Sequence, residues 1–190
     1  MRILWYNKFL RRWKKPKPKR KILVLLDLEN LLLNTDSTGP FGFSLVGGFT
    51  KIIRKLGEFG RVVEVFVFGP PPAINLNLDI LSQMKFWAIV CPKVVVEKTG
   101  PRIDTVDSEM IEFGKEMIAE MGDLSYLCIG SGDQDFLPLV KEAERSGLKI
   151  IIIAGNEKSL SKELAKFACR NPISNERAIY FFSPKDNSTN

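Results

Sequence analysis

The sequence predicts an α/β protein in which a mainly parallel β-sheet lies between two layers of helices. Short β-branched runs end in turns and are followed by stretches of helical period, a pattern typical of βαβ units. These runs are apolar on both faces, as the strands of a buried parallel sheet are. A length of 190 residues suits one domain with a single core.

Six apolar runs are the expected strands, and the stretches between them supply the expected helices. The strands are predicted at residues 22–26, 62–68, 87–90, 126–129, 150–154 and 179–182. The helices are predicted at about residues 45–59, 74–84, 105–121, 136–146 and 160–169. Right-handed crossovers between parallel strands distribute these helices over both faces, so the expected architecture is a three-layer α/β/α sandwich.

Positive charge is concentrated at the start of the chain, although the formal net charge of the whole is +6. Residues 1–21 contain ten Lys or Arg and no acid, which leaves eighteen basic and twenty-two acidic residues in the remainder. A polybasic segment on a mildly acidic body indicates contact with a polyanion, either nucleic acid or an anionic membrane surface. A solvated, disordered tail is the alternative interpretation.

The composition of both ends predicts a domain flanked by tails. Over residues 1–13, apolar residues recur at roughly helical spacing and basic residues form a face beside them, which predicts a short amphipathic helix. Alternating Pro and basic residues then favour an extended linker. We therefore predict a tail and linker at residues 1–20, one folded domain at residues 21–183, and a C-terminal tail at residues 184–190.

The absence of histidine restricts the chemistry available to this chain. Every Ser-His-Asp or Cys-His nucleophile and every imidazole zinc site is excluded. Cys91, Cys128 and Cys169 match neither a disulfide framework nor a zinc pattern, so we expect a reducing, cytoplasmic setting. No apolar run is long enough to span a bilayer. Catalysis would depend on carboxylates, lysines or hydroxyls, and among these clustered carboxylates suit Mg²⁺ or Mn²⁺ better than zinc.

Polar residues directly after the first strand are the first candidates for a site. In open α/β sheets, ligands bind outside the carboxyl ends of the strands, where strand order reverses. Asp27 follows the first apolar run immediately, and a carboxylate there is costly unless a cation or another group compensates its charge. Capping of a following turn or helix is the alternative for Asp27. Asn30 is either a turn residue or a group that orients a phosphate or a metal-bound water.

The segment GSGDQDF at residues 130–136 is the most informative in the chain. Two glycines relax the exit from the fourth strand, and Ser131, Asp133 and Asp135 stand just before a predicted helix. One acid is enough to cap a helix. Two acids and a hydroxyl provide more than a cap needs, and they could hold a hydrated cation.

A third group of acids opens the helix predicted at residues 105–121. Asp104 and Asp107 are three positions apart and therefore lie on nearly the same face. The helix macrodipole alone also favours acids at this position. Lys98 and Arg102 precede the helix and are either substrate-backbone contacts or solvated loop charges. Acids that meet at the edge where parallel strands end suit hydrolysis of a phosphodiester by metal-activated water.

The succession LLDLEN, TVDSEMIEFG and LCIGSGDQDFLPLV, followed by a strand and a Ser-Leu-Ser helix start, resembles the NYN domains of the PIN-like nuclease superfamily. The resemblance covers roughly residues 21–182 and implies a PIN-like, Rossmannoid fold. It also implies a Mg²⁺- or Mn²⁺-dependent nuclease acting on RNA, which we expect to be single-stranded. Asp27, Asp107, Asp133 and Asp135 are then the catalytic, metal-binding residues, with Asp104 as a further candidate ligand. Homodimerisation is compatible with the sequence.

Two other functions are compatible with the same residues. The first is a non-catalytic RNA-binding or regulatory module that keeps the acidic pocket without turnover. The second is a haloacid-dehalogenase-like phosphatase, in which Asp27 would be a nucleophile. That scheme normally has a second aspartate two positions after the first, where this chain has Glu29, so the phosphatase fits less well.

Overall fold

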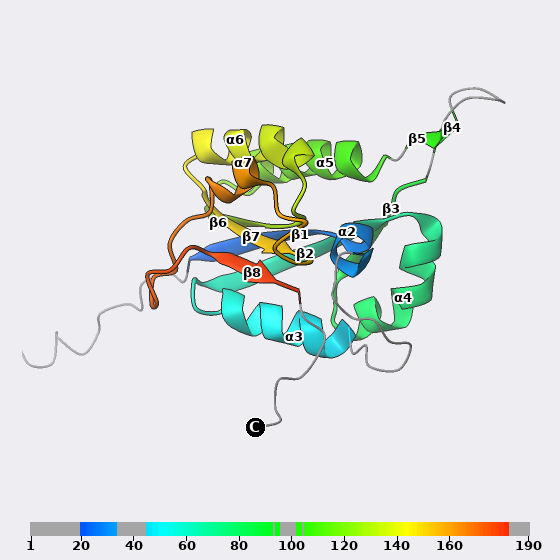
Figure 1. Ribbon diagram of the computed structural model, residues 1–190, viewed down its shortest axis with the longest axis horizontal. Helices are drawn as coiled ribbons and strands as arrows, with labels where there is room; N and C mark the ends of the chain where they lie inside the picture. Colours follow the sequence, from blue (N-terminus) through cyan, green and yellow to red (C-terminus); the bar gives the residue numbers. More distant parts are fainter. Residues whose placement is uncertain (1–19, 34–44, 93, 96–101, 104, 183–190) are drawn as a thin grey trace, which may run out of the picture.

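The computed structural model describes residues 20–33, 45–92, 94–95, 102–103 and 105–182. Within these residues the central sheet has six strands in the order β3-β2-β1-β6-β7-β8, and every neighbouring pair is parallel (Figure 1). The strands are β1 (Lys21–Asp27), β2 (Arg61–Gly69), β3 (Trp87–Val90), β6 (Leu124–Gly130), β7 (Lys149–Ala154) and β8 (Ile179–Phe181). A short antiparallel pair, β4 (Val94–Val95) and β5 (Arg102–Ile103), lies outside this sheet.

Helices cover both faces of the sheet, so the predicted three-layer sandwich is confirmed. One face carries α3 (Leu45–Leu56) and α4 (Pro71–Gln83), and the other carries α5 (Val106–Glu120), α6 (Leu137–Arg145) and α7 (Lys162–Ala165) (Figure 1). The six-residue helix α2 (Leu28–Leu33) continues directly from the end of β1.

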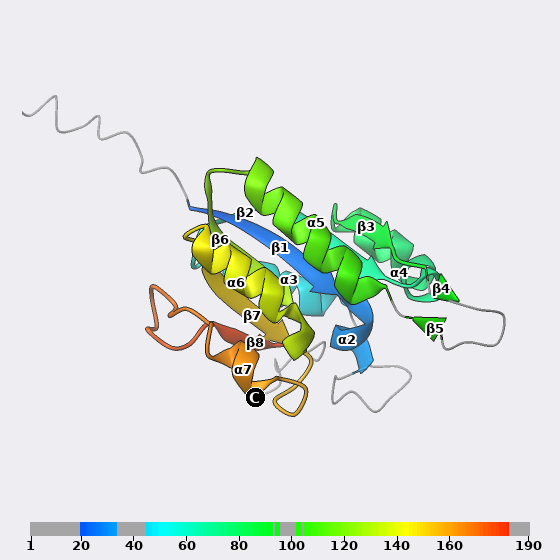
Figure 2. The ribbon, with the colours of Figure 1, turned by 90° about the horizontal axis from the view of Figure 1, so that it is seen from above.

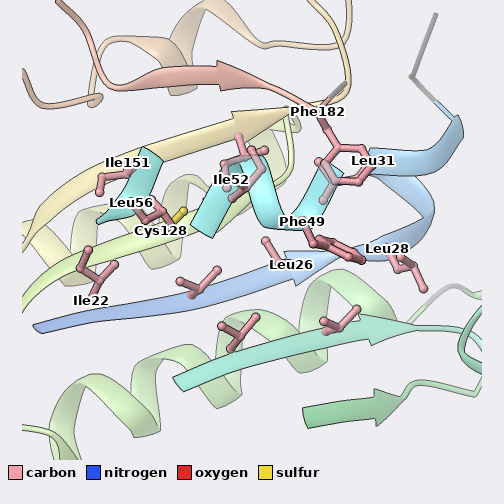
Figure 3. Packing of buried hydrophobic residues seen from close by; sticks show 14 of the residues in the cluster. Ile22, Leu26, Leu28, Leu31, Phe49, Ile52, Leu56, Cys128, Ile151 and Phe182 are labelled. Carbon is pink, nitrogen blue, oxygen red and sulfur yellow. The ribbon is translucent and has the colours of Figure 1, made fainter. Parts of the chain in front are cut away.

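The central strand β1 is apolar because both of its faces are buried. Ile22, Val24 and Leu26 pack in the cluster beneath α3 (Figure 3). Leu23 and Leu25 point the other way and pack in the cluster beneath α5 and α6. Complete burial of each such side chain stabilises the fold by about 1.5–3 kcal/mol. The run therefore shows no alternation of apolar and polar residues.

Strand order reverses between β1 and β6. From β1 the chain proceeds to β2 and β3 on one side of the sheet, and then to β6, β7 and β8 on the other. In a doubly wound sheet, the loops that leave two such neighbouring strands diverge to opposite faces and leave a crevice at the carboxyl edge. The ends of β1 and β6 are therefore the place in this fold where a ligand site is expected.

The strands match their predicted bounds within two residues, but some connecting elements differ. Neither α2 nor the β4–β5 pair was predicted, because six- and two-residue elements are too short to show a period. The last predicted helix, residues 160–169, shrinks to α7 (Lys162–Ala165). Its extension fails because Ala168 bridges to Ile150 and the Cys169 amide donates to the Ile150 carbonyl at 2.8 Å, which returns the chain to the sheet.

Several predictions concern positions outside the described residues. These are the amphipathic helix at residues 1–13, most of the linker, the C-terminal tail, Lys98 and Asp104. The backbone of Arg102 lies in β5, and nothing is described of its side chain. None of the described helices is both long and apolar enough to cross a membrane. The three cysteines are free thiols.

Asn171 stabilises the edge of the sheet that lies opposite the carboxyl ends of β1 and β6. Its side chain is 4% exposed. Nδ2 donates to Glu58 Oε2 at 2.7 Å and to the Tyr180 hydroxyl at 3.0 Å. Oδ1 accepts from the amides of Ile173 at 2.7 Å and Ser174 at 3.1 Å. This one side chain therefore joins the loop before β8 to the turn after α3.

Replacing Asn171 with Ala should lower the free energy of unfolding by about 2–3 kcal/mol, because buried polar groups lose their partners. The pKa of Glu58 lies below its usual 4.5, mainly because Asn171 donates a hydrogen bond to the carboxylate and, to a smaller extent, because Lys55 does. A lowered pKa stabilises the folded state above the unfolded-state pKa, and this contribution is lost as pH falls through the folded-state pKa. We measure the free energy of unfolding of both proteins with urea at several pH values. As the pH falls below 4.5, this free energy should decrease less in the variant than in the wild type. Identical stability and pH dependence in the two proteins would contradict this account.

Candidate functional site

Asp27 ends β1 and caps the helix that follows. Its side chain is 7% exposed, and Oδ1 accepts a hydrogen bond from the Asn30 amide at 3.1 Å. This is the geometry of a helix N-cap, so the capping role considered for Asp27 is present in the structure. Side chains alternate along a strand, and Asp27 therefore shares the face of Leu23 and Leu25, which pack beneath α5. A carboxylate is thus held in a largely buried position at the carboxyl edge of the central strand.

Asn30 connects the end of β1 to the end of β6. Its backbone amide donates to Asp27, and its side-chain Oδ1 accepts from the Gly132 amide at 3.4 Å. Asn30 and Gly132 are far apart in sequence, but they meet where strand order reverses. The bridge through Asn30 therefore holds the two acid-bearing loops, one after β1 and one after β6, next to each other.

The loop after β6 is shaped by its own side chains. Ser131 is fully buried, and its Oγ accepts from the Asp133 amide at 3.2 Å. The Ser131 hydroxyl therefore shapes the loop, and the contact with substrate that we expect of Ser131 stays a prediction. Asp133 is half-buried, and its Oδ1 caps the short 3-10 helix η2 (Gln134–Phe136) by accepting from the Asp135 amide at 3.1 Å. The Asp135 side chain is exposed.

A second loop, the one after β7, packs against Gly132. The Ser161 amide donates to the Gly132 carbonyl at 2.8 Å. A β-carbon at Gly132 would lie 2.1 Å from the Ser159 carbonyl oxygen, so only glycine fits this position. The loops after β6 and β7 are therefore in direct backbone contact.

An open cleft of about 360 Å³ lies between these loops. It is lined by Asn30, Gly132, Asp133, Gln134, Lys158, Ser159, Leu160 and Ser161. Asn30 and Asp133 were predicted from the sequence, whereas Lys158, Ser159 and Ser161 were not predicted as site residues. The available signal was their position after β7, which neighbours β6 in the sheet, but the sequence does not give strand order.

Asp107 occupies the first turn of α5. The amino end of this helix lies beside the carboxyl end of β1, close to α2, in two perpendicular views (Figures 1 and 2). Val106 and Met110 anchor it in the core cluster that also contains Leu25. The first turn of α5, which contains Asp107, therefore lies at the same sheet edge as the end of β1, and the place of Asp107 in the site stays a prediction.

The acids share an edge without forming a closed cluster. Among the described residues, no three Asp, Glu or Cys side chains lie close enough together to hold a metal ion. The donors at this edge are nevertheless all oxygen atoms, from carboxylates and an amide. Mg²⁺ is commonly held by one or two carboxylates, with water and substrate phosphate completing its shell. The donor chemistry therefore fits a hard divalent cation with few direct protein ligands.

Comparison with known proteins gives a family and a fold. A family model described as the NYN domain matches residues 21–174. A protein of unknown function from Vibrio parahaemolyticus is 18% identical, with a TM-score of 0.65 over 88% of this chain and 94% of that chain. MurG from Acinetobacter baumannii is 15% identical, with a TM-score of 0.42 over 87% of this chain and 47% of that chain. A search of curated protein sequences gave no match.

Replacing Gly132 with Ala should separate the two loops, because the added methyl group meets backbone atoms that have no room to move. We expect a loss of about 1–3 kcal/mol in the free energy of unfolding, measured by urea denaturation. Gly122→Ala is the matched control, since nothing lies within 4 Å of a β-carbon there. Equal stability of the two variants would show that the Gly132 contact does not constrain the fold.

Proposed function

We propose that this chain, which belongs to the NYN domain family of the PIN-like nuclease superfamily, is a metal-dependent ribonuclease that cleaves single-stranded RNA. The observation that carries the proposal is the bridge through Asn30, which brings the loops bearing Asp27 and Asp133 together where strand order reverses. In α/β sheets of this kind that position is the usual ligand site.

Four carboxylates are proposed as the metal-binding and catalytic residues: Asp27, Asp107, Asp133 and Asp135. The chemistry that Mg²⁺ or Mn²⁺ supplies when bound is activation of water and neutralisation of phosphate charge. Asp27 contributes a carboxylate largely shielded from solvent, whose negative charge favours a nearby cation. Asp133 lines the cleft, and its backbone is fixed by Ser131.

The protein's own residues also determine where substrate can lie. Asn30 lines the cleft with its amide already oriented by the Gly132 N–H, so it can orient a phosphate or a bound water. Lys98 and Arg102 are proposed to make further contacts with the phosphate backbone of the RNA substrate. The basic segment at residues 1–21 is proposed to bind RNA or an anionic membrane surface, and we propose a cytoplasmic location.

A non-catalytic RNA-binding module is the second candidate, and two observations favour it. No three acids of the described chain gather closely enough to hold a metal ion. Asp27 and Asp133 each already use one oxygen to cap a helix, as they would in a purely structural role. RNA affinity without turnover is what this alternative predicts. The family match gives no support to the phosphatase alternative.

Asp133→Asn should abolish cleavage while preserving the fold, because Asn caps helices about as well as Asp. Labelled single-stranded RNA is incubated with each protein in Mg²⁺, Mn²⁺ or EDTA. We expect metal-dependent cleavage by the wild type and a loss of roughly a hundredfold or more in the variant. Asp79→Asn, at an exposed position on α4, is the matched control and should cut normally. Cleavage that survives in both EDTA and Asp133→Asn would point to a contaminant and refute the assignment.

Asp27→Asn separates the two roles of Asp27. The variant keeps an N-cap oxygen for the Asn30 amide and loses the negative charge, so its melting temperature should stay within a few degrees of the wild type. RNA cleavage should fall as it does for Asp133→Asn. Normal cleavage by this variant would leave Asp27 with a capping role alone.

A further inference from the structure

We propose that Lys158 is a substrate-positioning residue that binds a backbone phosphate of single-stranded RNA in the cleft beside Asp133. This inference rests on the proposed function for the nature of the ligand, and it names the group that would hold the RNA chain there. Lys158 and Asp133 both line the cleft of about 360 Å³, a size within the range of small-ligand sites.

The backbone around Lys158 is held in a closed turn by its neighbours. The Ser159 amide donates to Asn156 Oδ1 at 2.9 Å, and the Asn156 amide donates to Ser159 Oγ at 3.1 Å. The Ser159 hydroxyl in turn donates to the Asn156 carbonyl at 3.0 Å. Because these reciprocal bonds enclose Lys158, its Cα has a defined place although its side chain is exposed to solvent.

The same turn is fixed relative to the acids. Gly132 contacts the Ser159 carbonyl so closely that no β-carbon fits, and its own carbonyl accepts from the Ser161 amide. Gly132 directly precedes Asp133. The wall that carries Lys158 therefore cannot move away from the wall that carries Asp133 without breaking these contacts.

The charges in the cleft call for an anion at Lys158. Among the described residues that line it, Lys158 is the single cation and Asp133 the single acid. Lys158 forms no ion pair with any described residue, whereas Lys166, the C-cap residue of α7, pairs with Glu163 at 3.2 Å. A phosphate approaching Asp133 is repelled by the carboxylate and needs a compensating positive charge. An ammonium group on a flexible stem binds phosphate as a point charge, without demanding a fixed geometry.

RNA binding tests this proposal separately from catalysis. A short fluorescein-labelled single-stranded RNA is titrated with full-length protein in EDTA, at several salt concentrations, and binding is followed by anisotropy. The proteins are wild type, Lys158→Ala, Lys158→Arg and Lys162→Ala. Lys162 is the matched control because it is exposed, stands four positions away, and does not line the cleft.

Lys158→Ala should weaken binding roughly three- to tenfold and reduce the slope of log affinity against log salt by about 0.7, the value for one lost phosphate contact on a single strand. Lys158→Arg should restore most of the affinity, and Lys162→Ala should change it less than about twofold. In the cleavage assay, Lys158→Ala should raise KM more than it lowers kcat.

The outcomes separate this inference from the proposed function. Equal binding by Lys158→Ala and Lys162→Ala overturns the role of Lys158, and metal-dependent cleavage would still stand if the wild type cuts. A Lys158-dependent loss of binding in a protein that never cuts RNA supports Lys158 and refutes the ribonuclease. A wild type that binds no single-stranded RNA refutes both.

Discussion

The double-sided burial of β1 is the constraint on which the rest of this structure depends. With β2 and β6 beside it and helices above and below, the strand is apolar and buried from Ile22 to Leu26, and its next polar residue is the last one, Asp27. The segment that follows β1 must therefore turn at the carboxyl edge of the sheet, and the segment that follows β6 turns at the same edge. The bond from the Gly132 amide to Asn30 follows from that adjacency. The cleft at this edge is a geometric result of placing the first strand in the centre of the sheet.

The carboxylates that cap helices at this edge are the same ones that are proposed to bind a metal ion. Asp27 and Asp133 each accept a backbone N–H through one oxygen, which fixes the direction of the side chain. A group whose orientation is already fixed loses less entropy when it binds a ligand. The structural and functional interpretations of these aspartates are therefore not exclusive, and the caps give the acids the fixed positions that binding or catalysis needs.

The sequence predicts the strands well because residues 22–26 and 150–154 are apolar on both faces, a pattern that little else in a small protein produces. It also predicts that Asp27, Asp107 and Asp133 lie at one edge, since that follows from the direction of strands and helices alone. It does not predict the wall containing Lys158. That wall exists because β7 lies next to β6 and Gly132 touches Ser159, a contact between distant residues that local periodicity does not encode. The same limit applies to α7, which is shortened by the Ala168 bridge to Ile150.

The absence of a side chain at Gly132 also limits how this sequence can vary. Most surface loops tolerate insertions and exchanges because few atoms depend on them. Here the Ser159 carbonyl fills the space that any other residue at position 132 would require, so nineteen of the twenty amino acids are disfavoured there by sterics alone. Neighbouring cleft residues such as Gln134, whose side chain is exposed, have no such restriction. Substitutions at such lining residues can thus change the chemical character of the cleft, while Gly132 keeps the distance between the two loops that form its walls.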